Sequence, residues 1–295
     1  PQTKEEYTKQ LEEQQKEQDN NKEEESTPER TVSKYKYKDG TWFVDKVTDG
    51  KKTVAESEYY IKNMVMVRNA ANAANIPFWF VLQAGANWND DMEPMSTTIN
   101  NTPTEGEFKW QVSTALAFGA KGITYFPLLQ PHYFALTKNA VMDYQRNGLL
   151  AEDGTTTKWY NYAKEVNDHI AVVDEVLMTA VNEAVIPVCG YAATNITSSL
   201  NDKGDSNLVK NSYKELSSVS TTQTTYGAVV GCFDYNGKTA LYVVNYDVTS
   251  QATITLHFSS DVVANVTIGT NTSEQQSQSM TLNVPAGEGA LVVLK

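Results

Sequence analysis

IPFWFVLQA, residues 76–84, and GITYFPLL, residues 122–129, are the two stretches that decide the fold. Each is a continuous apolar run of strand length, and such runs are typical of parallel strands that are covered on both faces. Helical periodicity precedes the first run, separates the two and follows the second. The resulting order, αβαβα with a long loop after each strand, predicts an α/β architecture.

The three predicted helices have recognisable ends. The first ends before Asn75, and the second begins at a T-x-x-E capping box of Thr104 and Glu107 and stops at Gly119. The third follows the turn at residues 153–155. The apolar residues expected on their inner faces are Tyr60, Met64, Val67 and Ala71 in the first, Phe108, Val112 and Ala115 in the second, and Ala163, Val166, Ile170, Val173 and Leu177 in the third.

Beyond about Ala184 the helical period disappears, and short alternating strands take its place. The clearest signal is a hairpin in which Asn236-Gly237, a pair that favours a two-residue turn, joins two such strands. His257 falls on the polar side of a strand and is expected to face solvent. The pattern predicts an antiparallel β-sandwich. Its strands are expected at 228–233, 239–245, 252–258, 262–268, 279–284 and 289–294.

Residues 1–33 are rich in Glu, Gln and Lys and nearly lack apolar side chains. Such a segment cannot bury enough surface to offset the entropy of ordering, so a disordered segment or surface insertion is predicted. A short hairpin is predicted around Asp39-Gly40. The predicted organisation is therefore a charged segment at 1–33, an α/β part at 34–183 and an all-β part at 184–295.

The composition excludes several classes of function. The formal net charge is −12 over 295 residues, which argues against a nucleic-acid partner because phosphate binding depends on clustered Lys and Arg. No run of about 18 apolar residues is present, so no membrane span is predicted. Cys189 and Cys232 each lie in an apolar stretch and are expected to be small buried side chains, with a disulfide between them as the alternative.

The number of α/β units is the critical observation. Two parallel strands cannot form a sheet that is covered on both faces, so the sheet requires more strands than this sequence supplies. The composition of residues 1–56 does not provide them. We therefore expect the remaining strands to precede Pro1 in a longer protein.

Residues 77–131 carry a resemblance to a known family. The segments PFWFVLQAGANW and PTEGEFKWQVSTALAFGAKGITYFPLLQP resemble the end of the barrel in glycoside hydrolases related to the family 42 β-galactosidases and in uncharacterised bacterial secreted proteins of the same type. NGLLAEDGTTTKWYNYAKEVNDHI and the LYVVNY pattern further on are also similar to such proteins. The resemblance implies the C-terminal portion of a TIM (β/α)8 barrel, with 76–84 and 122–129 as strands seven and eight, followed by an antiparallel β-sandwich.

The resemblance implies glycoside hydrolysis, which normally uses two carboxyl groups. In the clan of family 42 the acid/base lies at strand four, which this chain does not contain, and the nucleophile lies at strand seven. There this sequence has Gln83, and a neutral amide cannot attack as a carboxylate. The acids available in the following loop, Asp90, Asp91 and Glu93, are the catalytic candidates, with loop solvation as their alternative role.

Aromatic and amide side chains at the strand ends predict a sugar subsite, because sugar rings stack on aromatic faces while their hydroxyl groups bond amides. The alternative for Tyr125 is a place in the barrel core. His132 has no second ligand of suitable spacing, so no metal site is predicted, and no cofactor motif is present. The predicted substrate-binding residues are Gln83, Asn87, Trp88, Asn89, Tyr125, Gln130, His132 and Tyr133.

Three functions compete. The first is a secreted or cell-surface glycosidase that acts on oligo- or polysaccharides, with a site shared between missing upstream strands and the loops after Gln83 and Phe126. The second is a non-catalytic glycan-binding or scaffold protein on a degenerate barrel, and the third is a purely structural surface module. An Asn-Glu pair at the end of an upstream fourth strand would favour the first.

Overall fold

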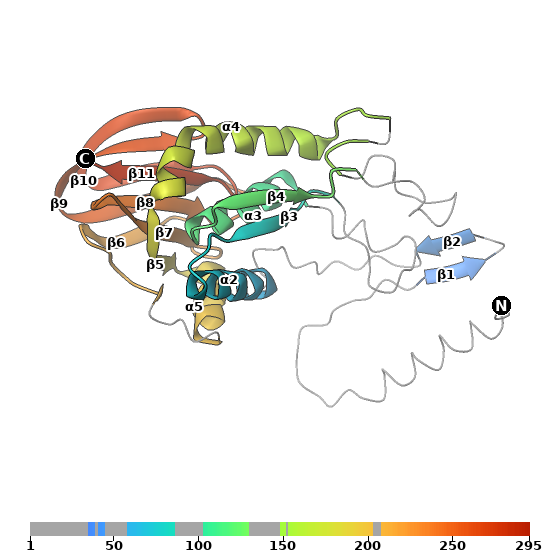
Figure 1. Ribbon diagram of the computed structural model, residues 1–295, viewed down its shortest axis with the longest axis horizontal. Helices are drawn as coiled ribbons and strands as arrows, with labels where there is room; N and C mark the ends of the chain where they lie inside the picture. The colour runs from blue at the N-terminus through green and yellow to red at the C-terminus, as the bar shows by residue number, and fades with distance from the viewer. Residues whose placement is uncertain are drawn as a thin grey trace.

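The computed structural model describes residues 58–85, 103–129, 148–151, 153–202 and 208–295, together with the backbone at 35–38 and 41–44 (Figure 1). These residues form a mixed arrangement of helices and strands with one large antiparallel sheet. Strands β1 (Tyr35–Lys38) and β2 (Thr41–Val44) pair antiparallel, which confirms the predicted N-terminal hairpin. The charged segment 1–33 lies outside the described residues.

Strands β3 (Trp79–Gln83) and β4 (Gly122–Phe126) form the predicted parallel pair. Helix α3 (Glu105–Ala117) connects them, helix α2 (Glu58–Ala73) precedes them and helix α4 (Lys158–Thr179) follows. The capping box is present as predicted: Glu107 N–H donates to the Thr104 hydroxyl, and Thr104 N–H donates to the Glu107 carboxylate. The order αβαβα is therefore confirmed in the described part of the chain.

The two faces of the β3–β4 pair differ. Phe78 and Leu82 are buried on the face covered by the helices, where Phe80 packs against Tyr60 of α2 with ring centroids 5.2 Å apart. On the opposite face Trp79, Val81 and Phe126 are 65%, 63% and 67% exposed. This open face of β3–β4, defined by these three residues and Thr124, is a large exposed apolar surface for a parallel sheet.

The large sheet contains seven strands in the order β10-β9-β11-β8-β7-β5, with β6 also paired to β9. Strands β7 and β8 form the predicted hairpin, and Asn236 and Gly237 in its turn both have positive φ, as a type I′ turn requires. The seven strands are β5 (Val181–Val188), β6 (Leu216–Thr221), β7 (Ala228–Tyr235), β8 (Lys238–Asn245), β9 (Ala252–Ile268), β10 (Asn271–Val284) and β11 (Gly289–Leu294).

Strand β9 makes the large sheet fold over a core of its own. Its first half pairs with β6 and its second half with β11, while β10 pairs with both halves. Side chains from β7 and β8, such as Val230 and Leu241, share one buried cluster with Ile254, Leu256 and Leu282. The alternate side chains of β7 and β8 point the other way and pack under the helices. The centre of the large sheet is therefore buried on both faces.

Helix α3 lies between the β3–β4 pair and the large sheet and is buried from Gly106 to Ala117 (Figure 1). Two glycines allow its backbone to approach closely. A Cβ atom on Gly106 would lie 1.9 Å from the carbonyl oxygen of Val248, and one on Gly231 of β7 would lie 2.1 Å from that of Ala117. Both contacts are far inside van der Waals range, so side chains at these positions are excluded.

Several details differ from the sequence prediction. Residues 190–202 form helix α5, where loss of helical periodicity was expected; the helix packs on α2, β5 and β7. Strand β5 crosses the 183/184 boundary that separates the predicted parts. Segments 252–258 and 262–268 form one strand rather than two. Val67 is 41% exposed because α2 turns Ile61, Met64 and Val65 inward instead.

The two cysteines have different environments. Cys232 is buried as expected, whereas Cys189 is exposed and adopts a positive φ of 47°. The expectation that Cys189 is buried was wrong because it lies at the turn from β5 to α5. Both thiols are free. Burial raises the pKa of Cys232, and partial shielding from water raises that of the exposed Cys189. Among the described residues, no helix combines the length and apolar character needed to cross a bilayer.

Candidate functional site at the strand ends

Two of the predicted site residues, Gln83 and Tyr125, lie in the described part of the chain, at the carboxyl ends of β3 and β4. Most of the candidates lie in the two segments that follow these strands in the sequence and are outside the described residues. The candidates outside the described residues are Asn87, Trp88, Asn89, Asp90, Asp91, Glu93, Gln130, His132 and Tyr133.

Gln83 is held by its neighbours on both its backbone and its side chain. Its Nε2 donates to the carbonyl oxygen of Gly85 at 2.8 Å. Its backbone N–H donates to Oε1 of Gln111 at 3.0 Å, and Nε2 of Gln111 donates back to the Gln83 carbonyl at 3.4 Å. Gln111 is a buried residue of α3, and its backbone carbonyl accepts a hydrogen bond from the Tyr60 hydroxyl at 2.7 Å.

The direction of these bonds places Gln111 at the edge of β3. The N–H of Ala84 donates to Phe126 of β4 at 2.7 Å. Successive residues of a strand direct their backbone groups to opposite sides, so those of Gln83 point away from β4. Gln111 therefore occupies the free edge of β3 at its last residue.

The Gly85 contact requires a hydrogen-bond donor at position 83. An amide supplies one, whereas an ionised carboxylate has only acceptors and would face the carbonyl dipole. This geometry fits glutamine better than an ionised glutamate. In the observed rotamer, Gln83 acts as a polar anchor of the strand end.

Tyr125 belongs to the helix side of the sheet. Its ring stacks on Phe108 of α3 with centroids 5.5 Å apart, and its hydroxyl donates to Oδ1 of Asn167 on α4 at 2.9 Å. Burial raises the pKa of Tyr125 to about 12. The ring therefore does not lie on the open face of β3–β4, where Trp79 packs over Gly122 instead.

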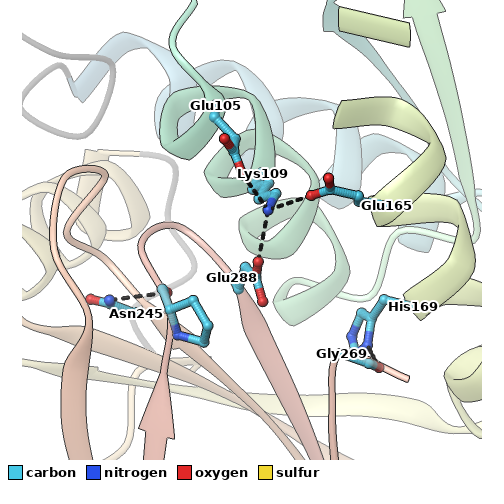
Figure 2. Close-up of polar contacts among 8 residues, drawn as sticks. Glu105, Lys109, Glu165, His169, Asn245, Gly269 and Glu288 are labelled. Atoms are coloured by element: carbon cyan, nitrogen blue, oxygen red, sulfur yellow. Dashed lines mark hydrogen bonds and ion pairs between the residues drawn. The ribbon is translucent and has the colours of Figure 1, made fainter. Parts of the chain in front are cut away.

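A second polar cluster joins the helices to the large sheet (Figure 2). Nζ of Lys109 lies 2.7 Å from Glu105, 2.8 Å from Glu165 and 2.9 Å from Glu288. The three carboxylates come from α3, α4 and the turn between β10 and β11, which Asn245 supports by donating to the Pro285 carbonyl at 3.1 Å. We call these four charged residues the ionic junction.

The ionic junction is electrostatically unbalanced. Burial alone lowers the pKa of Lys109, but hydrogen bonds to the three glutamates outweigh burial and raise it well above its usual value. One cation thus holds three carboxylates, which leaves a formal charge of −2. Its role follows from its position: it connects two helices to one turn of the sheet.

His169 of α4 lies beside the ionic junction (Figure 2). Its Nδ1 is 2.6 Å from the carbonyl oxygen of Gly269, and its Nε2 is 3.0 Å from the hydroxyl of Tyr242 on β8. Since a carbonyl can only accept, Nδ1 carries the proton. Burial lowers the pKa of His169. The hydrogen bond to the Gly269 backbone and the charge of Glu288 raise it, but they offset only part of the effect of burial.

The ionic junction and His169 were not found from the sequence. The i,i+4 spacing of Glu105 and Lys109 was the one local signal. Glu165 and Glu288 lie 56 and 179 residues from Lys109, so only the tertiary fold brings them together.

The outer face of the large sheet is polar where β6, β9 and β10 pair. His257 is half-buried there, with its ring nitrogens 3.1 Å from the hydroxyls of Ser220 and Ser279. It therefore points away from the core, as predicted. In the described ranges no three His, Cys, Asp or Glu side chains converge on a possible metal position.

No protein-family model matches the chain, and no curated protein matches it.

Proposed function

We propose that the chain is the C-terminal part of a glycoside hydrolase-like protein that acts on glycosidic bonds of oligo- or polysaccharides. The observation that carries the proposal is the pair β3–β4, joined through α3, with helices on one face and Trp79, Val81 and Phe126 exposed on the other. An open apolar face on a parallel pair is what the last two strands of a (β/α)8 barrel present when the other strands are supplied by preceding sequence.

The remainder of the chain supports the same proposal. The large sheet follows the α/β part, folds over its own core and fits the β-sandwich that the resemblance implies. Substrate would bind at the carboxyl ends of β3 and β4, where barrel enzymes build their sites. The carbohydrate substrate and a secreted or cell-surface location rest on the resemblance alone.

A specific observation favours the alternative, a non-catalytic glycan-binding protein on a degenerate barrel. The side-chain amide of Gln83 donates to Gly85 where the family pattern places a carboxylate nucleophile. Under this alternative, the strand end would hold glycan by hydrogen bonding without cleaving it.

The test compares the 295-residue chain with the longer protein that carries it, on aryl glycosides and natural oligosaccharides. We expect the longer protein to cleave at least one substrate and the chain alone to have little activity, because the missing strands contribute the acid/base. Binding without cleavage would select the scaffold alternative. If the longer protein neither binds nor cleaves any of these sugars, both proposed functions are contradicted.

Gln83→Glu in the longer protein probes the strand-seven position directly. If the degenerate site lacks only this carboxylate, hydrolysis should rise at least about tenfold over the parent, equivalent to about 1.4 kcal/mol in the barrier. Gln276→Glu, at an exposed position of strand β10, is the matched control and should leave hydrolysis unchanged.

A further inference from the structure

His169 lies where four elements meet. It projects from α4, its Nδ1 bonds the β9–β10 turn at Gly269, and its Nε2 bonds Tyr242 of β8. Tyr242 is 1% exposed and also hydrogen-bonds Ser113 of α3. We call the three residues His169, Tyr242 and Gly269 the histidine contact. It connects α4 to the large sheet.

The hydrogen bonds of the histidine contact have a defined direction. In the neutral imidazole, Nδ1–H donates to Gly269, and Nε2 accepts the Tyr242 proton. Ser113 can then donate to the oxygen of Tyr242. A second proton on Nε2 turns this acceptor into a donor, so the hydroxyls of Tyr242 and Ser113 must both reverse. The neutral ring fits the site without any such change.

The charges around the ring compete with its burial. Glu165 on α4 and Glu105 on α3 are both paired with Lys109 of α3, and Glu288 comes from the β10–β11 turn. The β9–β10 turn contributes only the Gly269 carbonyl, and β8 contributes the neutral Tyr242. Glu288 favours a protonated ring, but the cost of placing a cation in this buried position is larger.

We propose that the histidine contact is an acid-sensitive switch, in which protonation of His169 loosens α4 and the β9–β10 turn from each other while the rest of the large sheet stays folded. The proposal is independent of the proposed function. The step is a simple protonation: Nε2 gains a proton from solvent and loses the hydrogen bond it accepts. Solvation of the resulting imidazolium then favours withdrawal of the ring from the sheet.

The sign of the linkage follows from the lowered pKa. The unfolded chain binds a proton at His169 near pH 6.5, above the folded state. The contribution of neutral His169 to the free energy of unfolding is therefore fully present above about pH 6.5. It is lost as the pH decreases from there to the pKa of the folded state. Between the two pKa values, each decrease of one pH unit increases the unfolding equilibrium constant roughly tenfold.

The experiment uses the fact that the chain has three histidines. Nuclear magnetic resonance would follow the His Cε1–H signals with pH, and His169→Gln would identify one of them by its loss. Urea unfolding at pH 7.5 and 5.5 would measure how the free energy of unfolding changes with pH. Amide hydrogen exchange would show whether α4 and the β9–β10 turn open, once the rates are corrected for the pH dependence of exchange in an unfolded chain. We expect a His169 pKa below 6.5 and exchange in these two elements that increases more than in β7 and β8 at pH 5.5.

The matched control is the double variant His132→Gln/His257→Gln, which leaves His169 as the sole histidine. It should keep the pH dependence of the parent, whereas His169→Gln should lose it. If His169→Gln does not fold, the titration and exchange of the double variant still decide the matter. A His169 pKa at or above 6.5, or exchange that increases uniformly, would overturn the proposal.

Discussion

The β3–β4 pair and the large sheet are built from similar strands but are completed differently. Strands β7 and β8 of the large sheet are apolar on both sides, and the chain itself supplies a cover for each side. Strands β3 and β4 are equally apolar, yet the described residues cover only the helix side. An apolar strand thus predicts burial on both faces, but it does not identify the residues that cover each face.

The largest effect is expected where the two regions meet. Gly231→Val places a side chain against the α3 backbone, where even a Cβ atom would lie 2.1 Å from the Ala117 carbonyl. The free energy of unfolding, measured by urea denaturation, should fall by at least about 3 kcal/mol. Gly154→Asn is the control, since nothing lies within 4 Å of that site and Asn tolerates its positive φ. A tolerated Gly231→Val would mean that α3 is not fixed on the large sheet.

Two valines, one in the β3–β4 pair and one in the large sheet, allow the burial of the two strand surfaces to be compared. Val230 of β7 is 0% exposed and Val81 of β3 is 63% exposed. Val230→Ala should cost about 2 to 3 kcal/mol of unfolding free energy, because it removes two buried methyl groups and leaves a cavity. Val81→Ala should change it by less than about 0.5 kcal/mol. Equal costs would show that the open face is covered in solution.

The smallest of the three main effects is expected at the ionic junction. Lys109→Met removes the cation and leaves three carboxylates that are 24% to 58% exposed. Because water can solvate them in part, the cost should be about 1 to 2 kcal/mol, below that of a fully buried pair. Lys164→Met, which removes an exposed pair with Asp168, should have no measurable effect. If the two variants behave alike, the ionic junction does not hold α4 to the sheet.

Local signals predicted much of the fold. Thr104 and Glu107 fixed the start of α3, and Asn236-Gly237 fixed the β7–β8 turn, because each depends on residues close in the chain. Helix α5 was missed because the apolar residues at 192, 196 and 200 lie between Thr, Ser and Asn, which are weak helix formers. Its stability comes from packing on α2 and the large sheet, which no local pattern reports.

The candidate site could be predicted less completely. The position of Gln83 at a strand end followed from the length of an apolar run. The side to which Tyr125 points did not, because alternation assigns residues to two faces but does not say which face the helices cover. The carboxylates around Lys109 come from three distant segments, so their convergence required the fold.

Gln111 has a consequence for any strand that lies beside β3. Because its amide already bonds both backbone groups of Gln83, such a strand can pair with β3 only as far as Val81. The neighbour must then end two residues early, which leaves a notch about 7 Å long in the rim of the sheet. One side chain of a helix thereby limits how far a strand beside β3 can pair, although that helix is no part of the sheet.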